Sequence, residues 1–494
     1  MIDTQAIRKK ILDLALRGKL TEQLPEVGTG QELFQHIQER KAVLAGTGKA
    51  KKQEPLVPLS EEDIPFEIPD NWQWVRLGDI TAKITSGSTP TGGKKSDAYV
   101  DKGFCFFREQ NIYNDGIHSE GMVYITEQLL NTRENSTVIA KDILLNITGG
   151  SIGRCAIVPD DFSKGSINQH ILIIRMVEEE TRFFTHLVLC SPYAQNHIKS
   201  KAVGDKDGFS GGRCKYMPVP LPPLSVQKRI VSIIHSAFSV LDTIDTLQSQ
   251  YQDNLATLKS KIIDAGIQGK LTEQLPEDGT AEELYQQIQQ EKRKVLVARG
   301  GKEDKSIKPI EEDVPYILPS TWKWIRFGDI GLCKKGPFGS ALTKSMFVPK
   351  SDTTIKVYEQ QHAINKNKNL GTYYITREYF DEKMQGFEVR PGDVIISCAG
   401  TIGETYILPD DIEQGIINQA LMRVTIVPSI DKKFFQLFFD ARLKRNAQSQ
   451  SNGSAINNIP PFEVLKNWYF PLPPLAEQKR IVAKLEELLP LCEG

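Results

Sequence analysis

Residues 224–265, LSVQKRIVSIIHSAFSVLDTIDTLQSQYQDNLATLKSKIIDA, contain neither glycine nor proline. Within this stretch, residues spaced alternately four and three apart form a seam: Ile230, Ile234, Ala237, Leu241, Ile244, Gln248, Tyr251, Leu255, Leu258, Ile262 and Ala265. Only Gln248 among them is clearly polar. This spacing predicts a helix with a coiled-coil seam of about five heptads, roughly 60 Å long at 1.5 Å per residue. The alternative is an amphipathic helix on a globular core, but such helices seldom run this long.

Both ends of the chain carry pieces of the same pattern. A shift of 251 residues maps Leu258, Ile262 and Ala265 onto Ile7, Ile11 and Leu14, and it maps Ile230, Ile234 and Ala237 onto Ile481, Leu485 and Leu488. We therefore expect the two terminal segments to form parts of a second helix, antiparallel to the first, in a circular arrangement with pseudo-two-fold symmetry. The terminal segments offer no counterpart to residues 242–257, so we expect another subunit or a second copy to cover the middle of the central helix.

The segments around these helices are duplicated too. Residues 18–26, GKLTEQLPE, return letter for letter at 269–277, and NWQWVRLGDI at 71–80 returns as TWKWIRFGDI at 321–330. The tripeptide INQ at 167–169 returns at 417–419, and PLPPL at 220–224 returns at 471–475. The shift is always 250 or 251 residues, which indicates a duplicated architecture.

Each repeat contains short apolar runs broken by Gly, Asn, Asp and Pro, such as residues 142–146 and 170–174, which predict strands and turns with some helix. The expected fold class is α+β, with two similar mixed α/β domains separated by long antiparallel coiled-coil helices. The expected boundaries are a helical region at 1–45, a linker at 46–71, domain 1 at 72–223, a central helical region at 224–298, a linker at 299–320, domain 2 at 321–474 and a C-terminal helix at 475–494.

Composition limits the class of protein. A chain of 494 residues with 40% hydrophobic and 25% charged residues predicts two or more ordinary globular domains. The seven cysteines form no CxxC pair, so neither a zinc site nor a disulfide framework is indicated, and we expect a cytoplasmic protein. No apolar run approaches the length that spans a bilayer, and the first residues lack a secretion signal. The net charge of −1 is not typical of a nucleic-acid binder, so a DNA-binding role needs local basic patches or cationic partners.

The order of these motifs resembles the specificity subunits of type I restriction–modification systems over essentially the whole chain. The resemblance rests on W-x-W-[VI]-R-[LF]-G-D-I, P-L-P-P-L and Q-K-R-I-V, each followed by its repeat. It implies that each globular domain is a target recognition domain that reads one half of a bipartite site in double-stranded DNA, while the helices set the spacing and dock modification subunits. It further implies no catalysis and no cofactor in this chain: S-adenosylmethionine belongs to the modification subunit, and ATP with Mg²⁺ belongs to the restriction subunit.

Candidate DNA-binding residues follow from residue chemistry. Hydroxyls and lysines suit phosphates, whereas amides and cations suit base edges. Residues that differ between the copies are favoured for reading different bases, and shared residues are favoured as scaffold. In domain 1 the candidates are Ser86, Ser88, Lys94, Lys95, Gln110, Asn111, Asn114, Lys206, Arg213 and Lys215. In domain 2 they are Lys334, Lys335, Lys344, Gln360, Gln361, Lys366, Lys368, Arg442, Lys444, Arg445 and Asn452. Solvated or structural turns are the alternative at each position.

Two other classes of protein remain open. Residues 458–462, NIPPF, approach an amino-methyltransferase motif, but Ile459 interrupts it and no glycine-rich cofactor loop accompanies it. The PDD turns at 159–161 and 409–411 lack the E-x-K that a nuclease needs, and their duplication favours structural turns. A coiled-coil scaffold that never meets DNA is the second alternative, which the near-neutral charge supports weakly.

Overall fold

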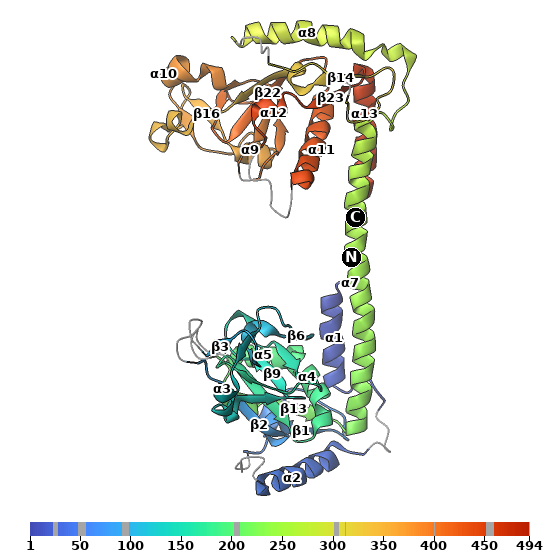
Figure 1. Cartoon of the computed structure of the whole chain (residues 1–494), viewed down its shortest axis with the longest axis vertical. Helices are drawn as coiled ribbons and strands as arrows, with labels where there is room; N and C mark the ends of the chain where they lie inside the picture. Colours follow the sequence, from blue (N-terminus) through green and yellow to red (C-terminus); the bar gives the residue numbers. More distant parts are fainter. Residues whose placement is uncertain are drawn as a thin grey trace. The chain divides into compact units, whose positions relative to one another are not determined.

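The computed structural model describes residues 1–22, 28–47, 56–90, 98–201, 208–300, 306–311, 313–399, 401–450 and 459–493, with the side chains of 444–450 excepted. The chain divides into two compact units, Met1–Ser249 (unit 1) and Gln250–Gly494 (unit 2), each of which is described by itself. Figure 1 traces both units along the sequence.

The helices of unit 1 are α1 (Thr4–Leu16), α2 (Gly30–Gly46), α3 (Glu127–Asn131), α4 (Arg182–Cys190), α5 (Pro192–Lys201), α6 (Gly211–Lys215) and the first part of α7 (Leu224–Ile267). Its strands are β1 (Gln73–Arg76), β2 (Thr81–Ser86), β3 (Tyr99–Val100), β4 (Phe104–Phe107), β5 (Ile112–Tyr113), β6 (Gly116–Ile117), β7 (Val123–Ile125), β8 (Thr137–Ile139), β9 (Ile143–Asn146), β10 (Cys155–Ile157), β11 (Lys164–Ile167), β12 (Ile171–Met176) and β13 (Pro218–Leu221).

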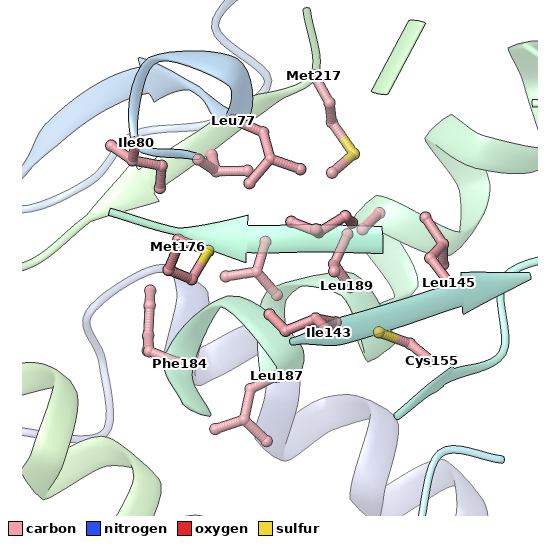
Figure 2. Close-up of a cluster of buried hydrophobic side chains, with 14 of the residues drawn as sticks. Leu77, Ile80, Ile143, Leu145, Cys155, Met176, Phe184, Leu187, Leu189 and Met217 are labelled. Atoms are coloured by element: carbon pink, nitrogen blue, oxygen red, sulfur yellow. The ribbon is translucent and has the colours of Figure 1, made fainter. Parts of the chain in front are cut away.

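Two sheets form the body of unit 1. One has the strand order β10-β9-β12-β2 and the other β3-β7-β4-β11-β8, and only the β4–β11 pair is parallel. Apolar side chains of β9 and β12 pack against α4 and the turn before β2, as Figure 2 shows for Ile143, Met176 and Leu189. The other faces of the same strands, with Leu144 and Ile173, form a second core against β4 and β11. The central strands β9 and β12 are thus buried on both faces, which explains their continuous apolar sequences.

The motifs that open and close each domain pair with each other. Strand β1, from the W-x-W motif, runs antiparallel to β13, from P-L-P-P-L, with Gln73 opposite Leu221. In unit 2, β14 (Lys323–Arg326) pairs with β23 (Tyr469–Leu472) in the same way, with Lys323 opposite Leu472. Both motifs recur in the sequence because together they close each domain.

Most of the remaining elements of unit 2 have a counterpart in unit 1, although the five-stranded sheet of unit 1 corresponds to a four-stranded sheet. The helices are α8 (Ala281–Ala298), α9 (Gln360–Ile364), α10 (Arg377–Tyr379), α11 (Lys432–Gln450), α12 (Phe462–Leu465) and α13 (Leu475–Leu488). The strands are β15 (Gly331–Lys335), β16 (Ile355–Tyr358), β17 (Tyr374–Ile375), β18 (Glu388–Val389), β19 (Val394–Ser397), β20 (Thr405–Ile407), β21 (Gly415–Ile417) and β22 (Leu421–Ile426). The sheets have the orders β15-β22-β19-β20 and β17-β16-β21-β18, and again the one parallel pair among the described strands, β16–β21, lies in the second sheet.

The expected central helix is confirmed and is one unbroken element of 44 residues, α7. The two terminal helices lie antiparallel to it, as expected. In unit 1 the backbone of Ile2 bonds to the Gln248 side chain, while Arg8 farther along α1 pairs with Asp242 at 2.7 Å. In unit 2 the side chains of Ile481 and Leu485 on α13 lie against Gly266 near the end of α7. Farther along the chain, Glu493 forms an ion pair of 3.3 Å with Lys259, which comes earlier in α7.

By length and composition α7 is also apolar enough to cross a membrane, with a mean hydropathy of 1.4 over its most apolar window. One such helix is weak evidence for a membrane span. Asp242 and Asp245 on α7 both pair with Arg8 of α1, contacts that fit a helix packed against protein.

The segments expected as linkers are partly packed on their domains. Phe66 makes edge contacts with Trp74 and Tyr193, and Asp63 pairs with Arg76 at 3.0 Å. In unit 2, Tyr316 makes the same kind of contact with Trp324. Residues 48–55 and 301–305, which hold most of the lysine-rich sequence, lie outside the described residues.

Candidate nucleic-acid interface

Four strands of unit 1 end at one edge of the domain. Ser86, the last residue of β2, pairs with Leu172, and Asn146, the last residue of β9, pairs with Ile171, so both strands end where β12 begins. Strands β4 and β11 are parallel and end at the same level, and a three-residue turn joins β11 to β12. We call the residues that follow these strand ends (86–90, 108–111, 146–154 and 167–170) the loop edge of unit 1.

The side chain of Asn168 fixes the loop edge of unit 1. Its Nδ2 donates to Glu109 Oε2 at 2.8 Å, and its Oδ1 accepts the backbone N–H of His170 at 3.0 Å. Asn146 Nδ2 donates to the backbone carbonyl of Glu109 at 2.8 Å. Burial opposes ionisation of Glu109, but the Asn168 amide and neighbouring cations outweigh it and lower the pKa of this carboxyl. Three loops are therefore held together by one asparagine–glutamate network.

A glycine brings the first loop into the same cluster. A Cβ atom at Gly87 would overlap the carbonyl oxygen of Ile167, so residues 86–90 lie directly on the turn at 167–170. Unit 2 repeats this contact: a Cβ at Gly336 would overlap the carbonyl oxygen of Asn418, and Asn418 Oδ1 accepts the N–H of Ala420 at 3.0 Å. The loop edge of unit 2 comprises 335–340, 359–364, 397–399, 401–403 and 418–420.

The two loop edges share this scaffold but carry different side chains. In unit 1 a hydrogen bond of 2.6 Å joins Thr148 Oγ1 and His170 Nδ1. The equivalent residues of unit 2 are Cys398 and Ala420. Lys335, which ends β15, stands where unit 1 has Ser86. Such differences suit domains that recognise different base sequences through a common framework.

In unit 1 the structure brings several predicted residues together. Ser86, Ser88 and Gln110 are exposed on the loop edge. Arg213 is exposed beside it, because its guanidinium donates to the Gly208 carbonyl at 3.4 Å and a Cβ at Gly208 would meet the Ile147 carbonyl. Asn114 is exposed on the neighbouring β5–β6 turn, with its Oδ1 accepting the Cys155 N–H at 3.0 Å.

Two predictions in unit 1 require correction. Asn111 is fully buried, and its amide bonds to the Arg108 N–H and to the carbonyls of His118 and Glu120, so it holds a turn and offers nothing to DNA. Lys215 lies at the opposite end of β2, where its side chain contacts Gly78. Lys94, Lys95 and Lys206 lie outside the described residues.

In unit 2 the lysines divide into two groups. Lys334 and Lys335 are exposed at the end of β15, and Lys344 is exposed on the segment that leads to β16. Lys366 is exposed next to the loop edge but paired with Glu404 at 2.7 Å. Lys368 requires correction: its side chain is mostly buried and pairs with Asp411, which precedes β21, so it lies at the end opposite the loop edge.

The other candidates of unit 2 are amides and arginines. Gln360 and Gln361 are half-buried on α9, and Gln361 donates to Glu359 at 2.8 Å. Arg442 is half-buried, with its guanidinium 5.7 Å from the centre of the Trp468 ring. The side chains of Lys444 and Arg445, and all of Asn452, lie outside the described residues.

Sequence reasoning missed two residues of the loop edges and a third that contacts one of them. Gln169 and Gln419 are exposed at equivalent positions of the two turns, yet as shared residues they served only to align the repeats. Arg133 comes from outside the loop edge: its guanidinium donates to the Ser88 carbonyl, and to Ser166 Oγ at 3.2 Å. The INQ repeat was the clue for the glutamines, whereas no local pattern marks Arg133.

The PDD sequences considered for a nuclease have structural roles, whereas Asn458 of the NIPPF segment lies outside the described residues. Asp160 accepts two hydrogen bonds from Nη2 of Arg182, each 3.1 Å long, and Asp411 pairs with Lys368, so the PDD sequences are turns. Among the described residues no group of three or more His, Cys, Asp or Glu side chains is arranged to hold a metal ion. All seven cysteines are free.

Comparisons with known proteins agree with the duplicated fold. The family model for the type I restriction modification DNA specificity domain matches residues 69–251 and again 319–492. The EcoEI specificity subunit of Escherichia coli is 25% identical over 99% of this chain and 89% of its own length, and the EcoAI subunit is 25% identical over 98% and 89%. Among solved structures, the HsdS subunit from Thermoanaerobacter tengcongensis matches with a TM-score of 0.50 and 18% identity over 87% of this chain and 92% of that one. A chain from a study of type I R-M complex assembly matches with a TM-score of 0.57 and 17% identity, over 87% and 93%. The chain therefore belongs to the type I restriction–modification DNA specificity family.

Proposed function

We propose that this chain is the sequence-specificity subunit of a type I restriction–modification complex, and that each unit reads one half of a bipartite DNA target. The observation that carries the proposal is the duplicated domain, matched twice by the family model, with the same loop-edge scaffold and different exposed side chains in each copy.

On the loop edges, exposed hydroxyls and cations position the phosphate backbone, and amides read bases. In unit 1, Ser86 and Ser88 contact phosphates and Gln110 faces a base edge. In unit 2, Lys334 and Lys335 take the phosphate role, and Gln360 and Gln361 lie nearest the bases. Lys344, Lys366 and Arg442 add positive charge around them.

In the complex, this chain recognises DNA and catalyses no reaction itself. The modification subunit brings S-adenosylmethionine, and the restriction subunit brings ATP and Mg²⁺. Because the net charge is −1, much of the positive charge that a DNA complex needs comes from these partners. The stiff helix α7 sets the number of base pairs between the two half-sites, as half-site spacing in other DNA-binding proteins follows from the geometry that links their reading elements.

The deciding experiment exchanges residues 72–223 for the corresponding domain of another family member with a different target. Methylated positions are then mapped across genomic DNA from cells that also carry the modification and restriction subunits. We expect a split motif in which one half changes and the other half is retained. An uninterrupted motif, or a motif unaffected by the exchange, contradicts the proposal. Calorimetry of the isolated chain with S-adenosylmethionine addresses the methyltransferase alternative, and we expect no stoichiometric binding.

A further inference from the structure

Unit 2 contains a cavity of about 350 Å³ between α8, residues 307–310 and β14. Five cationic side chains and one carboxylate line it: Lys292, Arg293, Lys308, Lys323, Arg326 and Asp329. The rings of Tyr285 and Trp324 form part of its walls. A cavity with this excess of positive charge suits an anion.

Among the described residues, two of these five cations lie within ion-pair distance of a carboxylate. The ammonium of Lys292 lies 3.8 Å from a carboxylate oxygen of Asp329, and the ammonium of Lys323 lies 2.5 Å from one of Glu282. The guanidinium of Arg326 donates only to backbone carbonyls, those of Lys308, Pro309 and Asn467, at 3.2, 2.6 and 2.7 Å. Within the described part of the chain, neither Arg293 nor Lys308 has a carboxylate at ion-pair distance.

A buried donor points to the same ligand chemistry. The side-chain nitrogen of Gln289, which lines the cavity, is buried and has no hydrogen-bond acceptor. An acceptor oxygen bound in the cavity would satisfy it.

The repeat supplies an internal comparison, because unit 1 has the same backbone here. Arg76 donates to the carbonyl of Val57 as Arg326 does to that of Lys308, which makes these positions equivalent. Unit 1 retains Lys41, Arg76 and Asp79, but Ala42, Val57 and Gln73 stand where unit 2 has Arg293, Lys308 and Lys323.

Two of the equivalent polar groups in unit 1, the amide of Gln38 and the ammonium of Lys41, are satisfied internally. Gln38, equivalent to Gln289, donates to the Asp79 carbonyl at 3.0 Å. Lys41, equivalent to Lys292, donates to the Gly78 carbonyl at 2.7 Å. The three additional cations and the unfilled amide are therefore particular to unit 2 and are not required by the fold.

We propose that this cavity binds a multivalent phosphate anion, either free or as the diphosphate of a nucleotide. Lysine and arginine side chains are suited to phosphate, and the buried amide adds a neutral donor. The cavity adjoins Asp329, just before β15 begins, whereas Lys335 at the other end of β15 marks the loop edge. The site is thus separate from the proposed DNA interface and does not depend on it.

Calorimetry of the full chain with inorganic pyrophosphate, at low ionic strength, tests the proposal. We expect one site, which the triple variant Arg293→Ala, Lys308→Val, Lys323→Gln weakens at least tenfold. These substitutions install the residues of unit 1 at the same positions, so the fold tolerates them, and circular dichroism melting verifies this. Gln289→Leu is expected to weaken binding severalfold. Lys294→Ala, an exposed cation of α8 outside the cavity lining, is the matched control and leaves affinity unchanged.

The same measurement with ADP and with a short DNA duplex identifies the source of the phosphate. ADP binding tighter than pyrophosphate indicates a nucleotide whose base contacts the aromatic walls, and equal affinities indicate a free anion. The proposal is wrong if pyrophosphate and ADP both fail to bind, or if the triple variant binds them as the unaltered chain does. It is also wrong if only the duplex loses affinity in the triple variant, since the cations then serve DNA.

Discussion

The indole N–H of Trp322 donates a 2.7 Å hydrogen bond to the carboxylate of Glu477, a side chain that is fully buried in unit 2. The other carboxylate oxygen accepts from Thr272 at 3.0 Å and from Gln274 at 2.9 Å. Glu477 thereby ties α13 and the second GKLTEQLPE segment to the start of domain 2. At the equivalent position unit 1 has Val226, which is also fully buried.

Replacing Glu477 by the valine of unit 1 is expected to destabilise unit 2 by about 2–4 kcal/mol, because Trp322 and Thr272 lose their acceptor in the interior and Gln274 keeps only backbone carbonyls. Urea unfolding measures the loss. Glu486→Gln, which breaks only the exposed pair with Lys433, is the control and is expected to change stability by less than about 0.5 kcal/mol. A valine variant as stable as the original chain would show that the network contributes nothing.

In unit 1, Arg175 holds the buried carboxylate of Asp142 through two hydrogen bonds of 2.7 and 2.8 Å. Burial raises the pKa of Asp142, and Arg175 opposes the rise. Arg175→Met is expected to cost about 3 kcal/mol at neutral pH, because it leaves a buried charge unpaired. The variant raises the pKa of Asp142 further. Its folded form then binds the proton more tightly than its unfolded form, so the loss shrinks as the pH falls toward that pKa.

Urea unfolding of the Arg175→Met variant at neutral and mildly acidic pH checks this sign. Adding Asp142→Asn removes the titrating group, and the double variant is expected to lose the pH dependence. A loss of stability in Arg175→Met that grows on acidification would contradict the assignment.

Gly87→Ala and Gly336→Ala are expected to disturb one loop edge each, because the new methyl group overlaps the Ile167 carbonyl in one case and the Asn418 carbonyl in the other. In the reconstituted complex, each variant should impair recognition of one half-site and spare the other, as measured by binding to targets altered in a single half. Gly339→Ala is the control, since its Cβ meets open space. Equal damage to both halves by either variant would argue against independent reading.

Lys335→Ala is expected to weaken binding of the reconstituted complex to all DNA sequences alike. It should also lower the slope of log affinity against log salt concentration by about 1, the effect of losing one phosphate contact. Lys368→Ala is the matched control, because Lys368 pairs with Asp411 away from the loop edge, and the slope should not change. A changed base preference in Lys335→Ala would instead assign this lysine to base reading.

Deleting residues 250–256 removes one heptad from α7 between the contacts with α1, which reach Gln248, and those with the C-terminal segment, which begin at Lys259. The seam keeps its register, and the helix shortens by about 10 Å. Methylation mapping is expected to show a spacer shorter by about three base pairs, given 3.4 Å per base pair. Thr257→Ala, which keeps the length of α7, is the control. An unchanged spacer in the deletion variant would contradict the proposal that α7 sets the distance between the half-sites.

The helices and the duplication could be predicted because they rest on local periodicity and on repeated letters. The seam from Ile230 to Ala265 predicted α7 almost to the residue, and the shift of 251 predicted that α1 and α13 lie antiparallel to it. The repeat predicted the helix that carries Glu477, but the partners of this carboxylate, at 272, 274 and 322, lie 205, 203 and 155 residues away in sequence.

Individual interface residues were harder to predict, because their exposure depends on contacts between distant strands. Asn111 was grouped with Gln110 by sequence, yet the turn at 118–120 buries one and leaves the other exposed. Lys215 and Lys368 follow sequence patterns typical of basic loops, but strand direction places both at the far end of their domains. The rule that shared residues build scaffold held for Asn168 and Asn418, whereas the exposed Gln169 and Gln419 escaped it.

The antiparallel pairing of α1 and α13 with α7 has a consequence for synthesis on the ribosome. Leu12 and Leu16 of α1 belong to the core of unit 1, so that unit has all its parts once the first half of α7 has emerged. Ile481 and Leu485 of α13 belong to the core of unit 2, which is therefore incomplete until α13 has been translated. A ribosome that stops early therefore releases a chain with one finished half and one unfinished half, and nascent-chain proteolysis would detect this asymmetry.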